Sequence, residues 1–135
     1  MASSAWELQK AVYAALTSDA PLTSLLGGAR VYDDVPRGIE PPYITFGQST
    51  VRDWSTGTDP GHEHLLTLHV WTRVNGERLV HQIMSAVRDR LHDGALTLSG
   101  FQLVNLRHEF SDSTREPDGE TIHGIVRYRA VTEPV

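Results

Sequence analysis

Hydrophobic residues recur at helical spacing in two parts of the chain. Residues 5–17 form one of these patterns and predict an amphipathic helix whose apolar face consists of Leu8, Ala11, Val12, Ala15 and Leu16. Ser4 and Glu7 have the spacing of a capping box, so this helix is expected to begin there. Glu77 to His92 form the second pattern, with an apolar stripe at Val80, Ile83, Met84, Val87 and Leu91. The sequence therefore predicts two main helices.

Shorter features separate these helices from the rest of the chain. Leu22 to Leu26 predict a short helix that ends at Gly27-Gly28, because glycine accepts the left-handed conformation of a helix cap. Arg30 to Tyr32 are expected to form a short edge strand. Asn75-Gly76 is expected to turn the chain into the second main helix, and Asp93-Gly94 to end it.

Four longer segments have the alternation that is typical of strands. They are about Tyr43 to Arg52, His62 to Arg73, Phe101 to Phe110, and Ile122 to Val131. Because successive side chains of a strand point to opposite faces, each segment has a predicted inner face, toward the helices. The predicted inner residues are Leu66, Leu68 and Val70 in the second strand, Val104, Leu106 and Phe110 in the third, and Val126, Tyr128 and Ala130 in the fourth.

The order of these elements predicts one α+β domain over residues 1–135. We expect an antiparallel sheet of about four strands, made of two hairpins, with two main helices packed on one face. The polar segments Asp53–Gly61 and Ser111–Glu120 are the expected hairpin loops, and the second contains the turn signal Pro117-Asp118-Gly119. The proline-rich segment Gly27–Gly47 is expected to be a stiff crossing from the helices to the sheet.

Composition and charge exclude several classes of protein. The 135 residues are 39% hydrophobic and 21% charged, as in an ordinary folded domain. The chain has no cysteine, so disulfides and thiolate metal sites are impossible. No apolar run approaches the ~20 residues of a membrane helix, and no membrane partner is expected. The net charge of −5 argues against binding of nucleic acid by phosphate neutralisation.

The strongest candidate for chemistry is a pair of histidines. His62 and His64 lie two residues apart on a predicted strand, so both imidazoles would reach the same face and one metal ion. A third ligand would come from His108 or His123. Two histidines specify little, and polar residues need no special explanation where a loop becomes a strand. We therefore expect no metal and no cofactor.

Other candidate catalytic groups have simpler explanations. The acidic pairs Asp33-Asp34 and Asp118 with Glu120 lie in predicted turns, where aspartate bonds its own backbone. Lys10 is the only lysine and is far from both pairs in sequence. The chain contains no G-x-S-x-G elbow that would present a serine nucleophile. No catalytic residue is predicted, and the protein is not expected to be an enzyme.

Aromatic and arginine side chains provide candidate contact residues instead. Trp6 is expected to pack within the domain. Trp54 lies in a loop of small polar residues, where it would either anchor an interface or fold back onto its own sheet. Trp71 is expected on the sheet face opposite the helices, either partly covered or buried by a neighbouring subunit. Arg127 and Arg129 share a non-core face, where they would be solvated or paired across an interface.

The residues taken in order resemble the tail-completion, or tail terminator, proteins of long-tailed phages and phage-like gene-transfer agents. The resemblance runs nearly end to end and rests on the order and spacing of several short pieces. After the first helix these are Arg30-Val31-Tyr32 with Pro36 and Pro42-Tyr43, Asp53-Trp54-Ser55, Leu66 to Trp71, Val87 to Leu91 with His92-Asp93, and Arg115 to Gly119 with His123-Gly124.

This resemblance implies a structural protein of the particle, with no catalytic residues. Members form a ring, normally of six subunits, which caps the tail tube, ends its polymerisation and joins the tail to the head-side connector. The implied partners are the chain itself, the tail tube protein and the connector or stopper protein. The implied location is the head-proximal end of the tail, after assembly in the bacterial cytoplasm. Six chains at −5 give −30, which suits a channel that DNA passes without specific binding.

Within such a ring we expect nine residues at contacts between subunits or between rings. Trp54 would anchor one of the two hairpin loops, and Asp33, Asp34 and Arg37 are poor candidates for burial within one chain. The full set is Asp33, Asp34, Arg37, Trp54, Trp71, Arg115, Asp118, Arg127 and Arg129. Two alternatives stay open at this point: a metal-dependent hydrolase that uses His62 and His64, and a dimeric cytosolic α+β module with an apolar ligand pocket.

Overall fold

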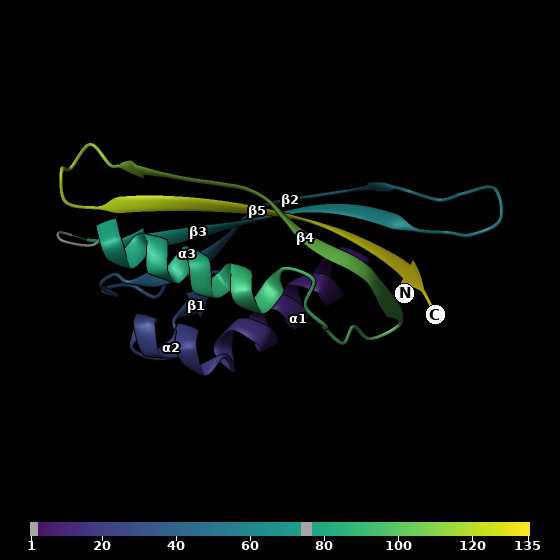
Figure 1. Cartoon of the computed structure of the whole chain (residues 1–135), viewed down its shortest axis with the longest axis horizontal. Helices are drawn as coiled ribbons and strands as arrows, with labels where there is room; N and C mark the ends of the chain where they lie inside the picture. The colour runs from purple at the N-terminus through teal and green to yellow at the C-terminus, as the bar shows by residue number, and fades with distance from the viewer. Residues whose placement is uncertain (1–2, 74–76) are drawn as a thin grey trace.

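The computed structural model describes residues 3–73 and 77–135, which form a five-stranded sheet with three helices on one of its faces (Figure 1). The elements in chain order are α1 (Ser4–Thr17), α2 (Ala20–Leu26), β1 (Val31–Tyr32), β2 (Tyr43–Asp53), β3 (His62–Thr72), α3 (Glu77–Leu91), β4 (Phe101–Arg115) and β5 (Ile122–Pro134). Within the described residues, no helix is long and apolar enough to cross a membrane.

The predicted α+β class is confirmed, but the number and direction of the strands differ. The strand order is β1-β2-β3-β5-β4, and β1 pairs parallel to β2, with Val31 opposite Ile44. The sheet is therefore mixed and has five strands, and α2 adds a third helix. The short helix expected at Leu22–Leu26 and the short edge strand expected at Arg30–Tyr32 are both present, as α2 and β1. The expectation of about four strands, all antiparallel, was wrong because it did not count this edge strand, which pairs parallel to β2. The expected turn at Asn75-Gly76 lies outside the described residues.

The pairing of β3 with β5 joins the two hairpins side by side. The register runs from His62 opposite Thr132 to Thr72 opposite Ile122. The loop that precedes His62 and the turn that precedes Ile122 must therefore lie at opposite ends of these strands. Figure 1 shows the result: residues 54–61 extend from one end of the long axis and residues 116–121 from the other.

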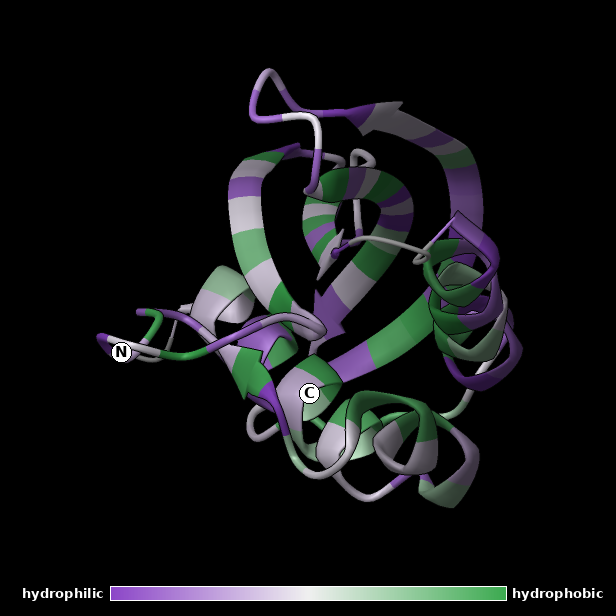
Figure 2. Cartoon of the chain, turned by 90° about the vertical axis from the view of Figure 1, so that its left-hand side faces the viewer, coloured by the Kyte–Doolittle hydropathy of each residue, from purple (hydrophilic) through white to green (hydrophobic). Residues whose placement is uncertain are grey.

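The core lies between the sheet and the helices. Figure 2 shows the alternation of hydrophobic and hydrophilic residues along the strands, and the hydrophobic stripes of the helices. The predicted inner residues of β3 and β5 are all buried, as is the whole stripe of α3: Leu66, Leu68, Val70, Val126, Tyr128, Ala130, Val80, Ile83, Met84, Val87 and Leu91. Contacts of α3 with β3, β4 and β5 hold the centre of this layer.

The first helix begins one residue earlier than the capping-box pattern predicts. Ser3 is the N-cap, and its hydroxyl accepts a hydrogen bond from the Trp6 amide at 3.2 Å. Ser4 instead contacts His62 Nδ1 at 3.1 Å, and Glu7 pairs with Lys10 at 3.0 Å. Both serines fit the cap by residue type, so the sequence could not separate them; tertiary contact with β3 decides the matter.

Two β-bulges in β4 change the faces predicted for that strand. The pairing with β5 shifts register between Leu103 and Asn105 and again between His108 and Phe110. Leu106 is buried, at 1% exposure, whereas Val104 is 47% and Phe110 43% exposed. The expectation that all three share one side was wrong because each bulge inserts an extra residue and resets the alternation.

The β4–β5 hairpin is also longer than predicted. The segment Ser111–Glu120 was expected to be a loop, but β4 continues to Arg115 and the connecting turn occupies only residues 116–121. Residues 111–115 of β4 lie at the edge of the sheet and are mostly exposed, whereas their β5 partners Ile122 and Gly124 pack toward α3. A polar strand of this kind carries no hydrophobic period from which it could be predicted.

Gly124 is the point of closest approach between β5 and α3. A Cβ atom at this position would lie 2.9 Å from Met84 Sδ and 2.9 Å from a Val80 methyl carbon. The approach allows α3 to rest directly on the centre of the sheet.

We therefore expect Gly124→Val to lower the free energy of unfolding by about 1–3 kcal/mol, because the added methyl groups displace α3. Urea denaturation would measure the change. Gly57→Ala, at a site with no atom within 4 Å of the added Cβ, is the matched control and should change stability by less than about 0.5 kcal/mol. Equal stability of the two variants would contradict the proposed contact.

His64 makes the stability of the fold depend on pH. Its ring is fully buried and contacts the Thr132 hydroxyl through Nε2 at 2.9 Å. Burial, and to a lesser extent the charge of His62, lower the pKa of His64 to about 4. In the unfolded chain the histidine takes up a proton near pH 6.5, so acidification favours unfolding.

The contribution of His64 to stability should be complete above about pH 6.5 and should be lost as the pH falls toward 4, at about 1.4 kcal/mol per pH unit at most. Urea midpoints measured across this window would show the slope. His64→Gln should flatten it, whereas His81→Gln, on the exposed side of α3, should leave it unchanged. Identical slopes in wild type and His64→Gln would contradict the assignment.

Candidate interaction surface

The sheet face opposite the helices, called the outer face below, holds most of the predicted contact residues. Alternation along β3 places Thr67, His69 and Trp71 on this face, and alternation along β5 places Arg127 and Arg129 there. All three helices lie on the other side of the sheet (Figure 1). The predicted positions of Trp71, Arg127 and Arg129 opposite the core are thus confirmed.

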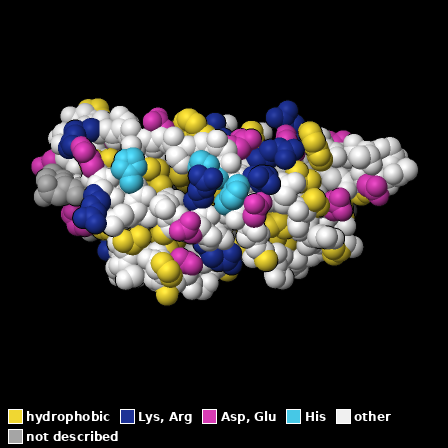
Figure 3. Space-filling view, in the orientation of Figure 1, with side chains coloured by type: hydrophobic (Ala, Val, Ile, Leu, Met, Phe, Trp, Pro, Cys, Tyr) yellow, Lys and Arg dark blue, Asp and Glu magenta, His cyan; other side chains and the backbone are white. Residues whose placement is uncertain are grey.

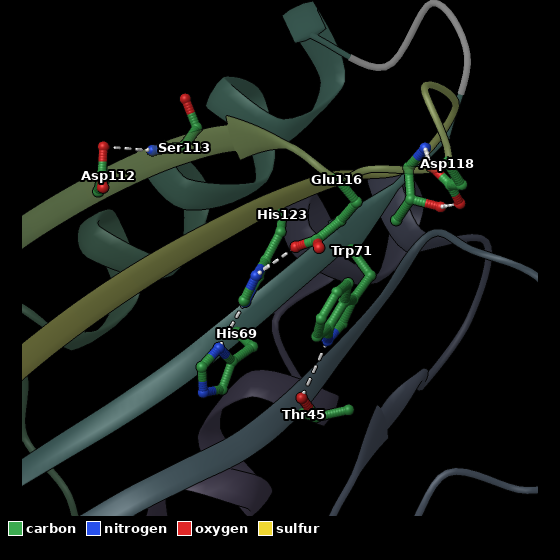
Figure 4. A network of polar contacts seen from close by, with 9 residues as sticks. Thr45, His69, Trp71, Asp112, Ser113, Glu116, Asp118 and His123 are labelled. Atoms are coloured by element: carbon green, nitrogen blue, oxygen red, sulfur yellow. Dashed lines mark hydrogen bonds and ion pairs between the residues drawn. The ribbon is translucent and has the colours of Figure 1, made fainter.

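One end of the outer face is a connected cluster of aromatic rings and polar groups (Figure 4). The Trp71 ring stacks on the His123 ring at 3.9 Å between centroids, and its Nε1 donates to Thr45 Oγ1 at 3.1 Å. His123 lies between two further partners, His69 Nδ1 at 2.6 Å and Glu116 Oε1 at 2.9 Å. These contacts tie β2, β3 and β5 to the turn after β4.

The cluster also lowers the pKa of His69. Burial lowers the pKa of His69, and the charge of His123 lowers it further. Neutral His69 shares one hydrogen bond with His123, between His69 Nδ1 and His123 Nε2. The other ring nitrogen of His123, Nδ1, contacts Glu116 Oε1. The arrangement fixes both rings in place and presents a half-buried, rigid surface.

Arginine side chains cover the middle of the outer face. The Arg127 guanidinium lies 5.6 Å from the centre of the Phe110 ring, and its Nε lies 3.4 Å from Thr67 Oγ1. Arg129 Nε donates to Glu63 Oε2 at 2.6 Å, and Arg52 binds the other carboxylate oxygen at 2.7 Å. Both predicted arginines are therefore half-buried and paired within their own chain.

Trp54 lies where the β2–β3 loop meets the outer face. Its ring packs against the Arg129 guanidinium at 5.0 Å, yet the side chain remains 51% exposed. Beside it is a shallow pocket of about 370 Å³, lined by residues of the loop and by Val104, Asn105 and Val131. The ring thus folds back onto its own sheet and still presents about half of its surface, and its role as an interface anchor stays a prediction.

Arg115 and Asp118 lie at the opposite end of the sheet and stabilise the β4–β5 turn. Asp118 accepts hydrogen bonds from the amides of Glu120 and Thr121 and from the Thr121 hydroxyl, at 2.7–2.9 Å. The Thr121 amide and hydroxyl and then the Glu120 amide lower the pKa of Asp118 to about 2. Arg115 binds the Gly119 carbonyl at 3.0 Å and Glu77 at 2.5 Å. Asp118 is therefore an ionised turn residue.

The third group of predicted residues lies at the β1–β2 edge of the sheet. Asp33, Asp34 and Arg37 are all exposed in the segment between β1 and β2, which contains a cis peptide bond at Pro41-Pro42. The nine predicted residues thus occupy three separate regions: the outer face with the adjoining Trp54, the β4–β5 turn, and this edge.

An apolar groove beside Asp33 was not predicted. It has a volume of about 400 Å³ and is lined by Trp6, Gln9, Lys10, Tyr13, Asp33 and Phe46. Trp6 and Tyr13 are each about half exposed, so the expectation that Trp6 packs within the domain was wrong. The signal was present in the sequence, since residues 6, 9 and 13 have the spacing of one helix face that points away from the core stripe.

The histidine pair does not form a three-ligand metal site. The His62 and His64 rings lie on one face at 6.3 Å between centroids, but they bind Ser4 and Thr132. His123 lies on the outer face with His69, and His108 binds Ser111 at 2.6 Å. Across residues 3–73 and 77–135 there is no group of three or more potential metal ligands.

The charged groups on the side of the molecule drawn in Figure 3 are interspersed rather than sorted by sign. Arginine and histidine side chains alternate there with carboxylates and hydrophobic residues. Close pairing of opposite charges, as between Glu63 and its two arginines, reduces the long-range field of such a surface. A mixed surface of this kind suits contact with another protein surface.

Comparison with known proteins supports a role in the tail of a particle. The family model described as "Tail completion protein gp17" matches residues 10–133. The tail completion protein gp17 of Bacillus phage SPP1 is 25% identical over 125 residues, which are 90% of this chain and 89% of that protein.

Two solved structures are also similar to this chain. A chain from the virion of a native gene transfer agent particle is 31% identical and superposes with a TM-score of 0.88, over 98% of this chain and 99% of that one. The structure of bacteriophage SPP1 gp17 is 21% identical with a TM-score of 0.54, over 93% and 88%, and shows a similar fold. The chain described here is a member of the tail completion protein family.

Proposed function

We propose that this protein forms a ring, of six subunits, that caps the tail tube, ends its polymerisation and joins the tail to the head-side connector. The observation that carries the proposal is the position of the two hairpin ends at opposite ends of one long sheet. A subunit with this shape can contact one partner with residues 54–61 and a different partner with residues 116–121.

The location of the protein follows from its family. Tail completion proteins belong to the tail of a virion or phage-like particle, and the similar gene transfer agent chain is part of such a particle. The partners that we propose are further copies of the chain, the tail tube protein and the connector or stopper protein. A ring requires head-to-tail contacts that close on themselves, so each subunit must carry two different lateral patches.

We further infer that the protein acts as a structural component and not as an enzyme. The groups that suggest chemistry already have structural partners: His62 and His64 bind Ser4 and Thr132, and Asp118 stabilises a turn. Ser111 contacts His108, but no carboxylate hydrogen-bonds to that histidine within the described part of the chain. Support for the hydrolase alternative is correspondingly weak.

The net charge of the ring suits the passage of DNA. Six copies at −5 give a formal charge of −30, and a channel of like charge repels the DNA backbone. The arginines of the outer face are paired with Glu63 or packed on aromatic rings. They are therefore poorly placed to hold phosphates.

The main test is an assembly reaction. Purified protein added to growing tail tubes should stop elongation, and electron microscopy should show a ring with six-fold symmetry at the tube end. Tubes that continue to lengthen at saturating protein would contradict the capping role.

A second test concerns Trp54. Trp54→Ala should reduce the fraction of tubes that carry the ring or a head by about tenfold or more, because exposed aromatic anchors contribute about 2 kcal/mol each to an interface. Trp54→Phe is the matched control and should retain most of the attachment. Circular dichroism should show both variants folded, and unchanged attachment in Trp54→Ala would contradict the anchor role.

A third test concerns DNA. The purified protein should not retard duplex DNA in a gel at about 0.1 M salt, because it lacks the excess of positive charge that neutralises phosphates. Retardation that weakens steeply with added salt would show that the ring binds DNA and would contradict the proposed channel.

A further inference from the structure

Two exposed apolar patches lie at opposite edges of the sheet. The first is the groove between α1 and the β1–β2 edge, where Trp6, Tyr13 and Phe46 form the walls. The second is the exposed ring of Phe110 on β4, the other edge strand, beside the bulge between His108 and Phe110. The strand order β1-β2-β3-β5-β4 separates the two patches by the full width of the sheet.

The groove is concave and its lining is mostly apolar. It has a volume of about 400 Å³, enough to receive an aromatic side chain from another surface. Lys10 contacts the Trp6 ring from one side, and Asp33 lines the groove, with Asp34 next to it in the exposed segment. The rim is therefore mixed, with two carboxylates at the β1 side.

The β4 patch presents an exposed aromatic ring in place of a groove. The bulge between His108 and Phe110 turns the Phe110 ring outward, where the Arg127 guanidinium supports it at 5.6 Å. Arg107 lies on the same strand, exposed, and is held weakly by Asp93 at 3.5 Å. The patch thus presents an aromatic side chain with two arginines and the exposed carboxylate of Glu109 beside it.

We propose that the two patches are the two halves of the subunit contact in the ring. Phe110 of one copy enters the groove of the next copy, between Trp6 and Tyr13. Arg107 and Arg127 then face Asp33 and Asp34 across the contact. This inference rests on the proposed ring and specifies which surfaces of the chain close it.

A second copy fits these patches better than another partner does. One patch is an apolar groove and the other presents an exposed aromatic ring; Asp33 and Asp34 lie at the first, Arg107 and Arg127 at the second, and both patches occur on every chain. Because they lie on opposite edges, one chain cannot join them within itself, and two chains that use one pair leave a second pair open. Only a closed head-to-tail arrangement uses every patch. The hairpin ends stay free for the tube and the connector.

Cysteine crosslinking tests the contact directly, because the chain has no cysteine of its own. In assembled tails under oxidising conditions, the double variant Tyr13→Cys with Phe110→Cys should give a ladder of covalent dimers, trimers and higher oligomers. Each single variant should remain uncrosslinked. A double variant Tyr13→Cys with Gln82→Cys, which uses α3 in place of β4, is the matched control and should give no ladder.

A second pair of substitutions keeps the aromatic residues intact. Lys10→Cys with Glu109→Cys replaces only exposed polar side chains at the same two patches, and it should give the same ladder even if the loss of Phe110 weakens the ring. Circular dichroism of each variant checks that it folds.

The outcomes separate this contact from the ring itself. Rings that are visible by microscopy but give no ladder with either pair would overturn the contact and leave the ring standing. Crosslinked dimers from one single variant would overturn it in favour of a two-fold contact between like patches. Tails that carry no ring at all would overturn the proposed function and, with it, this contact.

Discussion

The antiparallel pairing of β3 with β5 determines most of what this chain presents to other molecules. Each strand belongs to a different hairpin, and their register aligns the hairpins so that one points each way along the sheet. The same pairing brings Trp71 beside His123 and Thr67 beside Arg127, which builds the outer face. It also leaves β4 at one edge and β1 with β2 at the other. The positions of the two hairpin ends, the outer face and the two edge strands all follow from the pairing of β3 with β5.

Hydrophobic periodicity was sufficient to predict the elements that face the core. The stripe of α3 and the alternation of β3 and β5 identified their buried residues, because each lies against a single apolar layer. The pattern was insufficient where no such layer exists. Residues 111–115 of β4 lie at the edge of the sheet, are mostly exposed and carry no hydrophobic period. The bulges in β4 shift the inward-facing residues from one face to the other, and nothing in the residue types marks the inserted position, so alternation could not predict the faces of this strand.

The candidate surface was predictable in part, for a related reason. Trp71, Arg127 and Arg129 could be placed because alternation fixes their face. The contact of His69 with His123 could not, because it depends on which strands are neighbours, and α3 separates those strands in sequence. Glu63 shows the same limit: its two arginine partners come from β2 and β5. The sequence pattern thus predicts which face of the sheet a side chain occupies, but not which side chain of a neighbouring strand it contacts.

The bulges of β4 have a consequence for the behaviour of free subunits. A long, regular edge strand exposes a row of unpaired amides and carbonyls and templates the addition of further strands, which leads to fibres. In β4 the ladder is interrupted twice, so a second chain could not extend the sheet for more than a few residues. Copies can then meet through side chains, which favour a defined angle, and not through open-ended backbone pairing. The irregular edge therefore disfavours open-ended extension of the sheet by further copies of the chain.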